Sequence, residues 1–203
     1  MEAAQWDAKY AERDLVWSAG PNVFVERYAA DLPVGRALDV AGGEGRNALW
    51  LADRGWDATV ADFSQVALDR ALRIRAERPE KHGVFGVRRV DVLAAPLGAQ
   101  DFDLVVVAYL QLAGLQRRVA LRSAADAVAP GGHLLVVAHH TDNLADGYGG
   151  PQNPMWLYSE ADVLDDLEGT GLAPQVAERA ARTVHTDDGD RIAWDVVVLA
   201  TRP

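Results

Sequence analysis

The chain has 203 residues, enough for one domain with a sizeable core or at most two small ones. It contains no cysteine, which excludes disulfides, thiolate metal sites and a cysteine nucleophile. The formal net charge is −10, so the basic footprint of a nucleic-acid binder is missing, and no stretch approaches the ~20 apolar residues of a membrane helix. We therefore expect a soluble, cytoplasmic single domain over residues 1–203, a monomer or homodimer with neither nucleic acid nor membrane as a partner.

Strand-like and helix-like segments alternate along the chain, which predicts an α/β fold with a mostly parallel sheet and helices on both faces. In chain order we predict a strand at 36–41, a helix at 47–54, a strand at 56–62 and a helix from the Ser64 N-cap to before Pro79. Strands at 84–92 and 102–110, a helix at 115–129, a strand at 133–140, a helix at 159–168 and strands at about 175–185 and 192–200 follow. The last two strands flank Asp187-Asp188-Gly189, a tight-turn sequence that predicts a closing hairpin.

A glycine-rich turn follows the first predicted strand, in the stretch RALDVAGGEGRNALW at 36–50. Gly43 and Gly45 lie where the backbone bends sharply and approaches a ligand closely. Together with Ala48 they also satisfy the dinucleotide fingerprint in its G-x-G-x-x-A form. By itself this match is weak, because a tight strand-to-helix turn explains it too.

Two acids end the next two predicted strands. Asp62 lies about twenty residues past the turn, where a carboxylate accepts both hydroxyls of a ribose. Asp91 ends the third strand, within reach of an adenine amino group. Each alone is compatible with a solvated strand end, but their occurrence on consecutive strands favours an adenosine-containing ligand.

Three features favour S-adenosylmethionine over a dinucleotide. Asp39 before the turn and Glu44 within it repel phosphates but suit a cationic sulfonium with a free ammonium group. The segment 1–34 is rich in aromatic residues and suits either a helical lid over a sulfonium or helices that cover a sheet edge. The chain is also too short for the second half-sheet or substrate domain of a dinucleotide enzyme.

The stretch LDVAGGEGRNALWLADRGWDATVADFS at 38–64 resembles the class I S-adenosylmethionine-dependent methyltransferases, within them the small tellurite-resistance and thiopurine-methyltransferase-like group. The resemblance extends to Val90-Asp91-Val92, to Pro130-Gly131-Gly132 and to the last hairpin. It implies a Rossmann-like open sheet of seven strands that ends in a β-hairpin. The chain departs from the family at Ala41, where the family has the first glycine of the turn.

The resemblance also implies which residues bind the cofactor. The methionine part would lie on Ala41, Gly43 and Gly45, with Asp39 near its ammonium group. Asp62 would hold the ribose. The remaining implied cofactor contacts are Phe63, Asp91 and Val92 around the adenine, Ala108 and Tyr109 beside the sulfonium, and Trp17 from the lid.

His139 and His140 end the fifth strand at the edge where open α/β sheets bind substrates, and adjacent residues point to opposite faces, so at most one of them faces the acceptor. The resemblance implies His139 as the candidate general base, because relatives have a histidine at this place. A buried, purely structural histidine is the alternative. His185, near the closing hairpin, is a second candidate, from the position of polar residues in relatives. His140 and Asp142 share a face and could bind a divalent metal ion, but two ligands are too few to define a site, so we assign no metal ligands.

The segment 141–158 has no periodicity and is predicted to be a long loop that shapes the acceptor pocket, although a structural loop also fits. Within it Gln152, Trp156 and Tyr158 offer hydrogen bonds and aromatic surface to a small organic or sugar-like hydroxyl. The leading hypothesis is therefore a small-molecule methyltransferase acting on oxygen, with a thiol or chalcogen acceptor next. A nicotinamide-dependent oxidoreductase and a non-catalytic cofactor-binding module are the alternatives from other classes.

Overall fold

The computed structural model describes residue 7, residues 20–78 and residues 82–203. Trp17, the lid residue expected to contact the cofactor, lies outside these ranges. The elements are, in chain order, α2 (Val23–Ala29), β1 (Arg36–Val40), α3 (Arg46–Asp53), β2 (Asp57–Asp62), α4 (Gln65–Glu77), β3 (Phe85–Arg89), β4 (Phe102–Ala108), α5 (Gly114–Asp126), β5 (Val128–His139), the 3-10 turns η1 (Thr141–Leu144) and η2 (Pro154–Trp156), α6 (Glu160–Leu167), β6 (Ala173–Thr186) and β7 (Gly189–Thr201).

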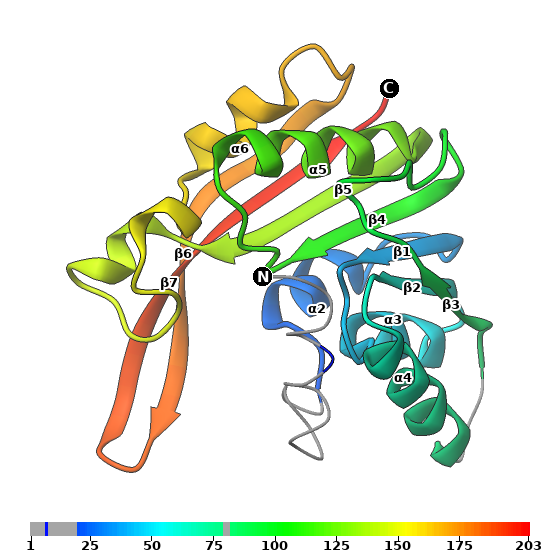
Figure 1. The fold of residues 1–203 in the computed structure, drawn as a ribbon, viewed down its shortest axis with the longest axis horizontal. Helices are drawn as coiled ribbons and strands as arrows, with labels where there is room; N and C mark the ends of the chain where they lie inside the picture. Colours follow the sequence, from blue (N-terminus) through cyan, green and yellow to red (C-terminus); the bar gives the residue numbers. More distant parts are fainter. Residues whose placement is uncertain (1–6, 8–19, 79–81) are drawn as a thin grey trace.

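The strands form one seven-stranded sheet in the order β3-β2-β1-β4-β5-β7-β6. Strands β1 to β5 are parallel, and β7 runs antiparallel to both β5 and β6. The order of the strands reverses between β1 and β4, and ligands of open α/β sheets bind at such a switch point, outside the carboxyl ends of the strands. Figure 1 shows this edge of the sheet and the β6–β7 hairpin that extends beyond it.

Two apolar layers cover the sheet, because alternate residues of each strand face opposite sides. Ala37, Val60 and Val106 pack on one face against α2, α3 and α4. Leu38 and Val107 pack on the other face against α5 and α6. Figure 1 shows the two groups of helices on opposite sides of the sheet. The central strand β4 is buried on both sides, as its continuous apolar run predicts.

The predicted open sheet with its terminal hairpin is confirmed, with three local differences. The third strand ends at Arg89 rather than near 92. The helix predicted at 115–129 ends at Asp126, and β5 begins at Val128. The residues after Val128 bulge out of the ladder, with Gly131 at φ 77°, so that β5 begins before residue 133, the predicted start of this strand.

Within the described ranges, no helix is both long and apolar enough to cross a lipid bilayer.

Candidate active site

The glycine turn after β1 takes three left-handed backbone conformations within five residues. Ala41, Gly43 and Gly45 have φ of 52°, 57° and 75°. Glycine adopts this region freely, whereas an alanine there is strained by roughly 1–2 kcal/mol. Gly45 is the N-cap of α3, so the turn delivers the chain directly into the first turn of that helix. The turn is therefore built for close backbone approach, and Ala41 is its one strained position.

Asp39 lies just before this turn with its carboxylate buried against the start of α3. Its oxygens accept long hydrogen bonds from the Asn47 side chain, at 3.4 Å, and from the Ala48 amide, at 3.3 Å. Burial raises the pKa of Asp39 to about 6, although these two bonds and the nearby Arg46 guanidinium act in the opposite direction. A buried carboxylate with so little compensation suits a cationic ligand group.

Asp62 ends β2 directly beside the turn. One of its carboxylate oxygens accepts from the Gly43 amide at 2.9 Å, and the other accepts from the Ser64 amide at 2.8 Å. Burial raises the pKa of this carboxyl as well. The structure therefore joins the predicted ribose acid to the predicted methionine-binding turn by a direct hydrogen bond.

Glu44 contributes less uncompensated negative charge to the turn than the sequence suggests. Its side chain is buried and pairs with Arg70 at 2.9 Å, so much of its charge is offset within the protein. Asp39, rather than Glu44, is the acid in this turn with little compensation.

The predicted adenine contacts lie at the outer part of the same edge. Asp91 follows the end of β3, is exposed, and accepts a hydrogen bond from the Leu93 amide at 2.9 Å. Phe63 and Val92 are half-buried. These positions leave all three side chains accessible next to Asp62.

Tyr109 follows β4 at the switch point, and its backbone is also left-handed, with φ 59°. Its amide donates to the Val137 carbonyl at 2.8 Å, and its ring stacks on His139 with centroids 4.5 Å apart. The Arg46 and Arg182 guanidinium carbons each lie 5.8 Å from the centre of the Tyr109 ring. A strained residue that touches groups from three elements is typical of a functional site.

Asp195 of β7 is a site residue that sequence reasoning missed. It is fully buried, and one oxygen (Oδ2) accepts from the Tyr109 hydroxyl at 3.0 Å and from Arg182 Nε at 2.6 Å. Its other oxygen lies 3.3 Å from His139 Nδ1. Burial acts to raise the pKa of Asp195, but His139 and Arg182 together hold it below its usual value. The one signal in the sequence is an acid at the head of the apolar run Val196–Ala200.

The predicted pocket loop contacts His139 through Gly150. A Cβ built on Gly150 would lie 2.9 Å from His139 Cγ, so only glycine fits against the ring. Gln111, also missed from the sequence, accepts from the His139 amide at 3.2 Å and donates to the Trp156 carbonyl. These contacts tie the loop to the end of β5.

The three predicted acceptor residues occupy different environments. Gln152 and Trp156 are exposed, and the Gln152 side chain donates to the Gly150 carbonyl at 3.3 Å. Tyr158 is buried in the core, and its hydroxyl donates to the Leu110 carbonyl at 2.9 Å. The structure therefore places Gln152 and Trp156, but not Tyr158, on the accessible side of the loop.

The remaining histidines serve other roles. His140 is buried, caps η1 by accepting from the Asp142 amide, and faces Glu160. His185 is 83% exposed and sits beside Asp190 in the hairpin, about 17 Å along β7 from Asp195 at ~3.4 Å per residue. The structure does not bring it to His139. Among the described residues, no group of three or more acidic or histidine side chains is arranged to hold a metal ion.

The start of α2 is hydrogen-bonded to residues beside the glycine turn. The Asn22 side chain caps α2, and the Asn22 backbone N–H donates to the Asn47 side-chain oxygen at 2.9 Å. Asn47 in turn donates to Asp39. The entry into α2 is therefore linked by two hydrogen bonds to the carboxylate at the end of β1.

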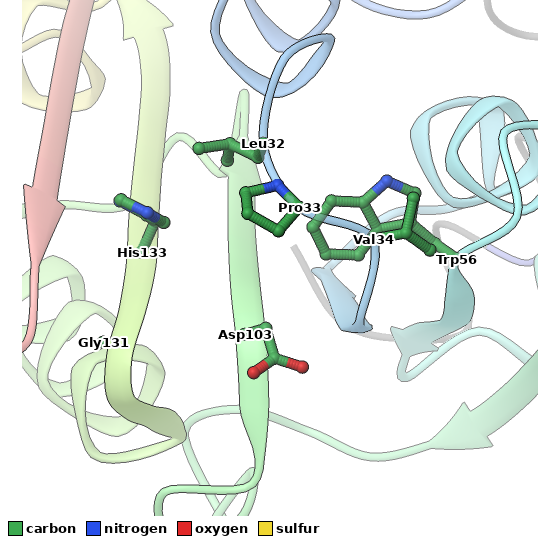
Figure 2. A pocket seen from close by; sticks show the side chains of 7 residues that line it. All are labelled: Leu32, Pro33, Val34, Trp56, Asp103, Gly131 and His133. Atoms are coloured by element: carbon green, nitrogen blue, oxygen red, sulfur yellow. The ribbon is translucent and has the colours of Figure 1, made fainter.

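A cavity of about 190 Å³ lies at the opposite end of the strands. Figure 2 shows its lining, with Leu32, Pro33, Val34 and Trp56 next to one another, Asp103 on β4 and His133 on the neighbouring strand β5. These residues precede or begin β1, β2 and β4, or lie early in β5, so the cavity is remote from the carboxyl ends. We do not assign it to the cofactor.

Comparison with known proteins agrees with this geometry. Residues 37–132, just under half of the chain, match the methyltransferase domain family. No curated protein matches. Among solved structures, a protein studied for the conversion of a disulfide bond into a thioacetal group during echinomycin biosynthesis is 22% identical, with a TM-score of 0.72 and coverage of 98% of this chain and 92% of the other. A TehB-like S-adenosylmethionine-dependent methyltransferase from Corynebacterium glutamicum is 21% identical, with a TM-score of 0.61 and coverage of 99% and 96%.

The S-adenosylmethionine-dependent methyltransferase SibL, solved in its apo form, is 27% identical, with a TM-score of 0.65; the match covers 89% of this chain and 54% of SibL. The domain match, the strand order and the glycine turn are together those expected of a class I S-adenosylmethionine-dependent methyltransferase. The expected cofactor is therefore confirmed, and the dinucleotide alternative is not supported. The site also fits this cofactor, because the undercompensated Asp39 carboxylate suits the methionine ammonium group.

The strain at Ala41 predicts that Ala41→Gly stabilises the protein. Relief of the left-handed alanine, partly offset by the greater freedom of glycine in the unfolded chain, should raise the free energy of unfolding by about 0.5–1 kcal/mol. Thermal unfolding should show Tm higher by about 1–4 °C. Ala76→Gly, an exposed position in α4, is the matched control and should lower Tm. An equal fall in both variants would contradict the strain.

The raised pKa of Asp39 predicts pH-dependent cofactor binding. Below about pH 6 the carboxyl is neutral, so its attraction for an ammonium group is lost and the affinity for S-adenosylhomocysteine should fall. Asp39→Asn should weaken that affinity at least tenfold at pH 8 and remove its dependence on pH near 6, as measured by calorimetry.

Methylthioadenosine, which lacks the ammonium and carboxylate groups, is the control ligand. Its affinity should be unchanged by Asp39→Asn. Equal weakening of both ligands would show that Asp39 supports the turn rather than contacts the ammonium group.

Proposed function

We propose that this protein transfers a methyl group to a hydroxyl of a small-molecule acceptor, with His139 as the general base. The observation that carries the proposal is the position of the His139 ring. His139 ends β5 at the carboxyl edge of the sheet, and its ring stacks on Tyr109, which follows β4. Strand β4 pairs with β1, the strand that leads into the glycine turn.

The other ionisable groups at this edge are less suited to take a proton. The Asp39 carboxylate is buried against the start of α3, and Asp195 already accepts from Tyr109 and Arg182. Burial and the neighbouring Asp195 raise the pKa of Tyr109, so its hydroxyl stays protonated at neutral pH. His139 is 18% exposed at its side chain, and its Nδ1 faces Asp195. The opposite ring nitrogen, Nε2, is therefore the atom for the acceptor.

When bound, S-adenosylmethionine supplies an electrophilic methyl group, and its C–S bond breaks as the acceptor oxygen bonds to that carbon, which leaves S-adenosylhomocysteine. His139 Nε2 accepts the hydroxyl proton as the oxygen lone pair forms the new bond. General-base catalysis of this kind contributes about a hundred- to ten-thousandfold in rate. The turn, Tyr109 and the Gly150 loop align the reactants, and alignment can supply about 7–11 kcal/mol of the barrier.

Gln152 and Trp156 are our candidates for acceptor contacts, because both are exposed on the loop that touches His139. Asp62, with Phe63, Asp91 and Val92, is our candidate for the adenosine side. His185 and Tyr158 have no part in the proposal, since one lies far along the hairpin and the other in the core.

A sulfur acceptor is the second candidate. It is favoured by the fold shared with the protein solved in the work on echinomycin biosynthesis, where a disulfide bond becomes a thioacetal group. A thiolate acceptor is already ionised and needs no base. A screen with radiolabelled S-adenosylmethionine against phenols, sugar alcohols, hydroxy acids and thiols separates the two, and transfer to none of them would favour a non-catalytic binding module.

The base role predicts that His139→Gln lowers turnover of a hydroxyl acceptor by about a hundredfold or more. Affinity for S-adenosylhomocysteine should change by less than about threefold, because the imidazole lies on the acceptor side. Steady-state methyl transfer and calorimetry measure the two quantities. Unchanged turnover would contradict the base role.

The contact with Gly150 predicts that Gly150→Ala lowers turnover about tenfold or more, since the new Cβ displaces the His139 ring. Gly149→Ala is a matched control with φ 77°, against 76° at Gly150, but a Cβ there meets nothing within 4 Å. Both variants therefore carry the same backbone strain. Equal losses in both variants would mean that the ring position is not what matters.

A further inference from the structure

We propose that Asp195 is a positioning residue, which holds His139 in the tautomer with the proton on Nδ1 and Nε2 toward the acceptor, while Arg182 holds the Asp195 charge in place. The inference deepens the proposed function and rests on His139 as the base. It concerns β6 and β7, which lie outside the segment that matches the methyltransferase family.

Strand pairing brings the two residues together. In the antiparallel ladder of β5 and β7, His139 is directly opposite Asp195, and directly opposite side chains lie on the same face of a sheet. His139 Nδ1 and Asp195 Oδ1 are buried and 3.3 Å apart, and neither atom makes a hydrogen bond among the described residues. A buried acceptor and a buried ring nitrogen that face only each other favour a shared proton on Nδ1.

The second oxygen of Asp195 is fully used. It accepts from Arg182 Nε at 2.6 Å and from the Tyr109 hydroxyl at 3.0 Å. Arg182 comes from β6, two residues from Ala180, the partner of Asp195 in the ladder. A buried carboxylate without a cation is costly, so the Arg182 guanidinium keeps Asp195 ionised.

The arrangement fixes where a proton can go. Arg182 and Tyr109 donate to Oδ2, and His139 faces Oδ1, so the proton from the acceptor stays on the imidazole rather than passing to Asp195. The other charged neighbour is Arg46 of α3, which lies 5.8 Å from the centre of the Tyr109 ring and also favours an ionised Asp195. Tyr109 thus links the cofactor turn to the base through the same carboxylate.

The tautomer of His139 tests the proposal directly. We would measure ¹⁵N and ¹H NMR spectra of the imidazoles in the whole protein at a pH where they are neutral, with His139→Gln to assign the signal. The wild type should show the proton on Nδ1. Asp195→Asn should shift the ratio of tautomers at least tenfold toward the proton on Nε2, because the amide side chain can donate to Nδ1.

Asp190→Asn is the matched control, because Asp190 lies 2.6 Å from Nδ1 of the exposed His185. It should alter the His185 signal and leave His139 unchanged. A wild-type His139 with its proton on Nε2 would overturn the proposal, even if Asp195→Asn failed to fold. An unchanged ratio in a folded Asp195→Asn protein would do the same. If the tautomer shifts but His139→Gln retains methyl transfer, the positioning holds and the base role is wrong.

Discussion

The pairing of β1 with β4 is the constraint on which the site depends. It joins two strands that are far apart in the sequence. From this pair the sheet is extended by β2 and β3 on the side of β1 and by β5, β7 and β6 on the side of β4. Asp39 is opposite Val106, so the turn that follows β1 and the strained Tyr109 that follows β4 emerge at one edge. Parallel strands cannot be joined by a short turn, so each next element returns as a helix, and the carboxyl edge is left to loops.

Charge at this edge is divided between two buried carboxylates with different surroundings. Asp39 has two long hydrogen bonds and a raised pKa, which suits it to an incoming cationic group. Asp195 has an arginine, a tyrosine hydroxyl and a histidine around it, and its pKa is lowered. We therefore expect the Asp39 carboxylate to bind a ligand group, whereas the Asp195 carboxylate interacts with the protein's own side chains. Hydrogen bonds through Asn47 and Asn22 connect the Asp39 carboxylate to the start of α2. The Tyr109 hydroxyl connects the Asp195 carboxylate to the switch point.

The sequence predicts which residues gather around the glycine turn better than it predicts the surroundings of His139. Asp39, Gly43, Gly45 and Asp62 lie within one β-α-β unit, where spacing along the chain determines spacing in the fold. Asp195 and Arg182 were missed because they reach His139 only through the β5–β7–β6 pairings, which single-sequence patterns do not specify. Tyr158 was placed in the pocket from its aromatic ring and hydroxyl, yet the hydroxyl is satisfied by a carbonyl inside the core. Two glycines serve different structural purposes. Gly150 permits a close approach to His139, whereas Gly131 lies in a bulge within β5.

We propose that the cofactor lies across the β1–β4 switch point, with its ammonium group on Asp39 and its sulfur toward His139. A crystal structure with S-adenosylhomocysteine tests this most directly. The account predicts the ammonium group within hydrogen-bond distance of the Asp39 carboxylate and the ribose hydroxyls on Asp62. It also predicts that the sulfur faces Tyr109 and the His139 side of the edge. A ligand bound in the cavity of Figure 2, or a sulfur that faces away from His139, would contradict it.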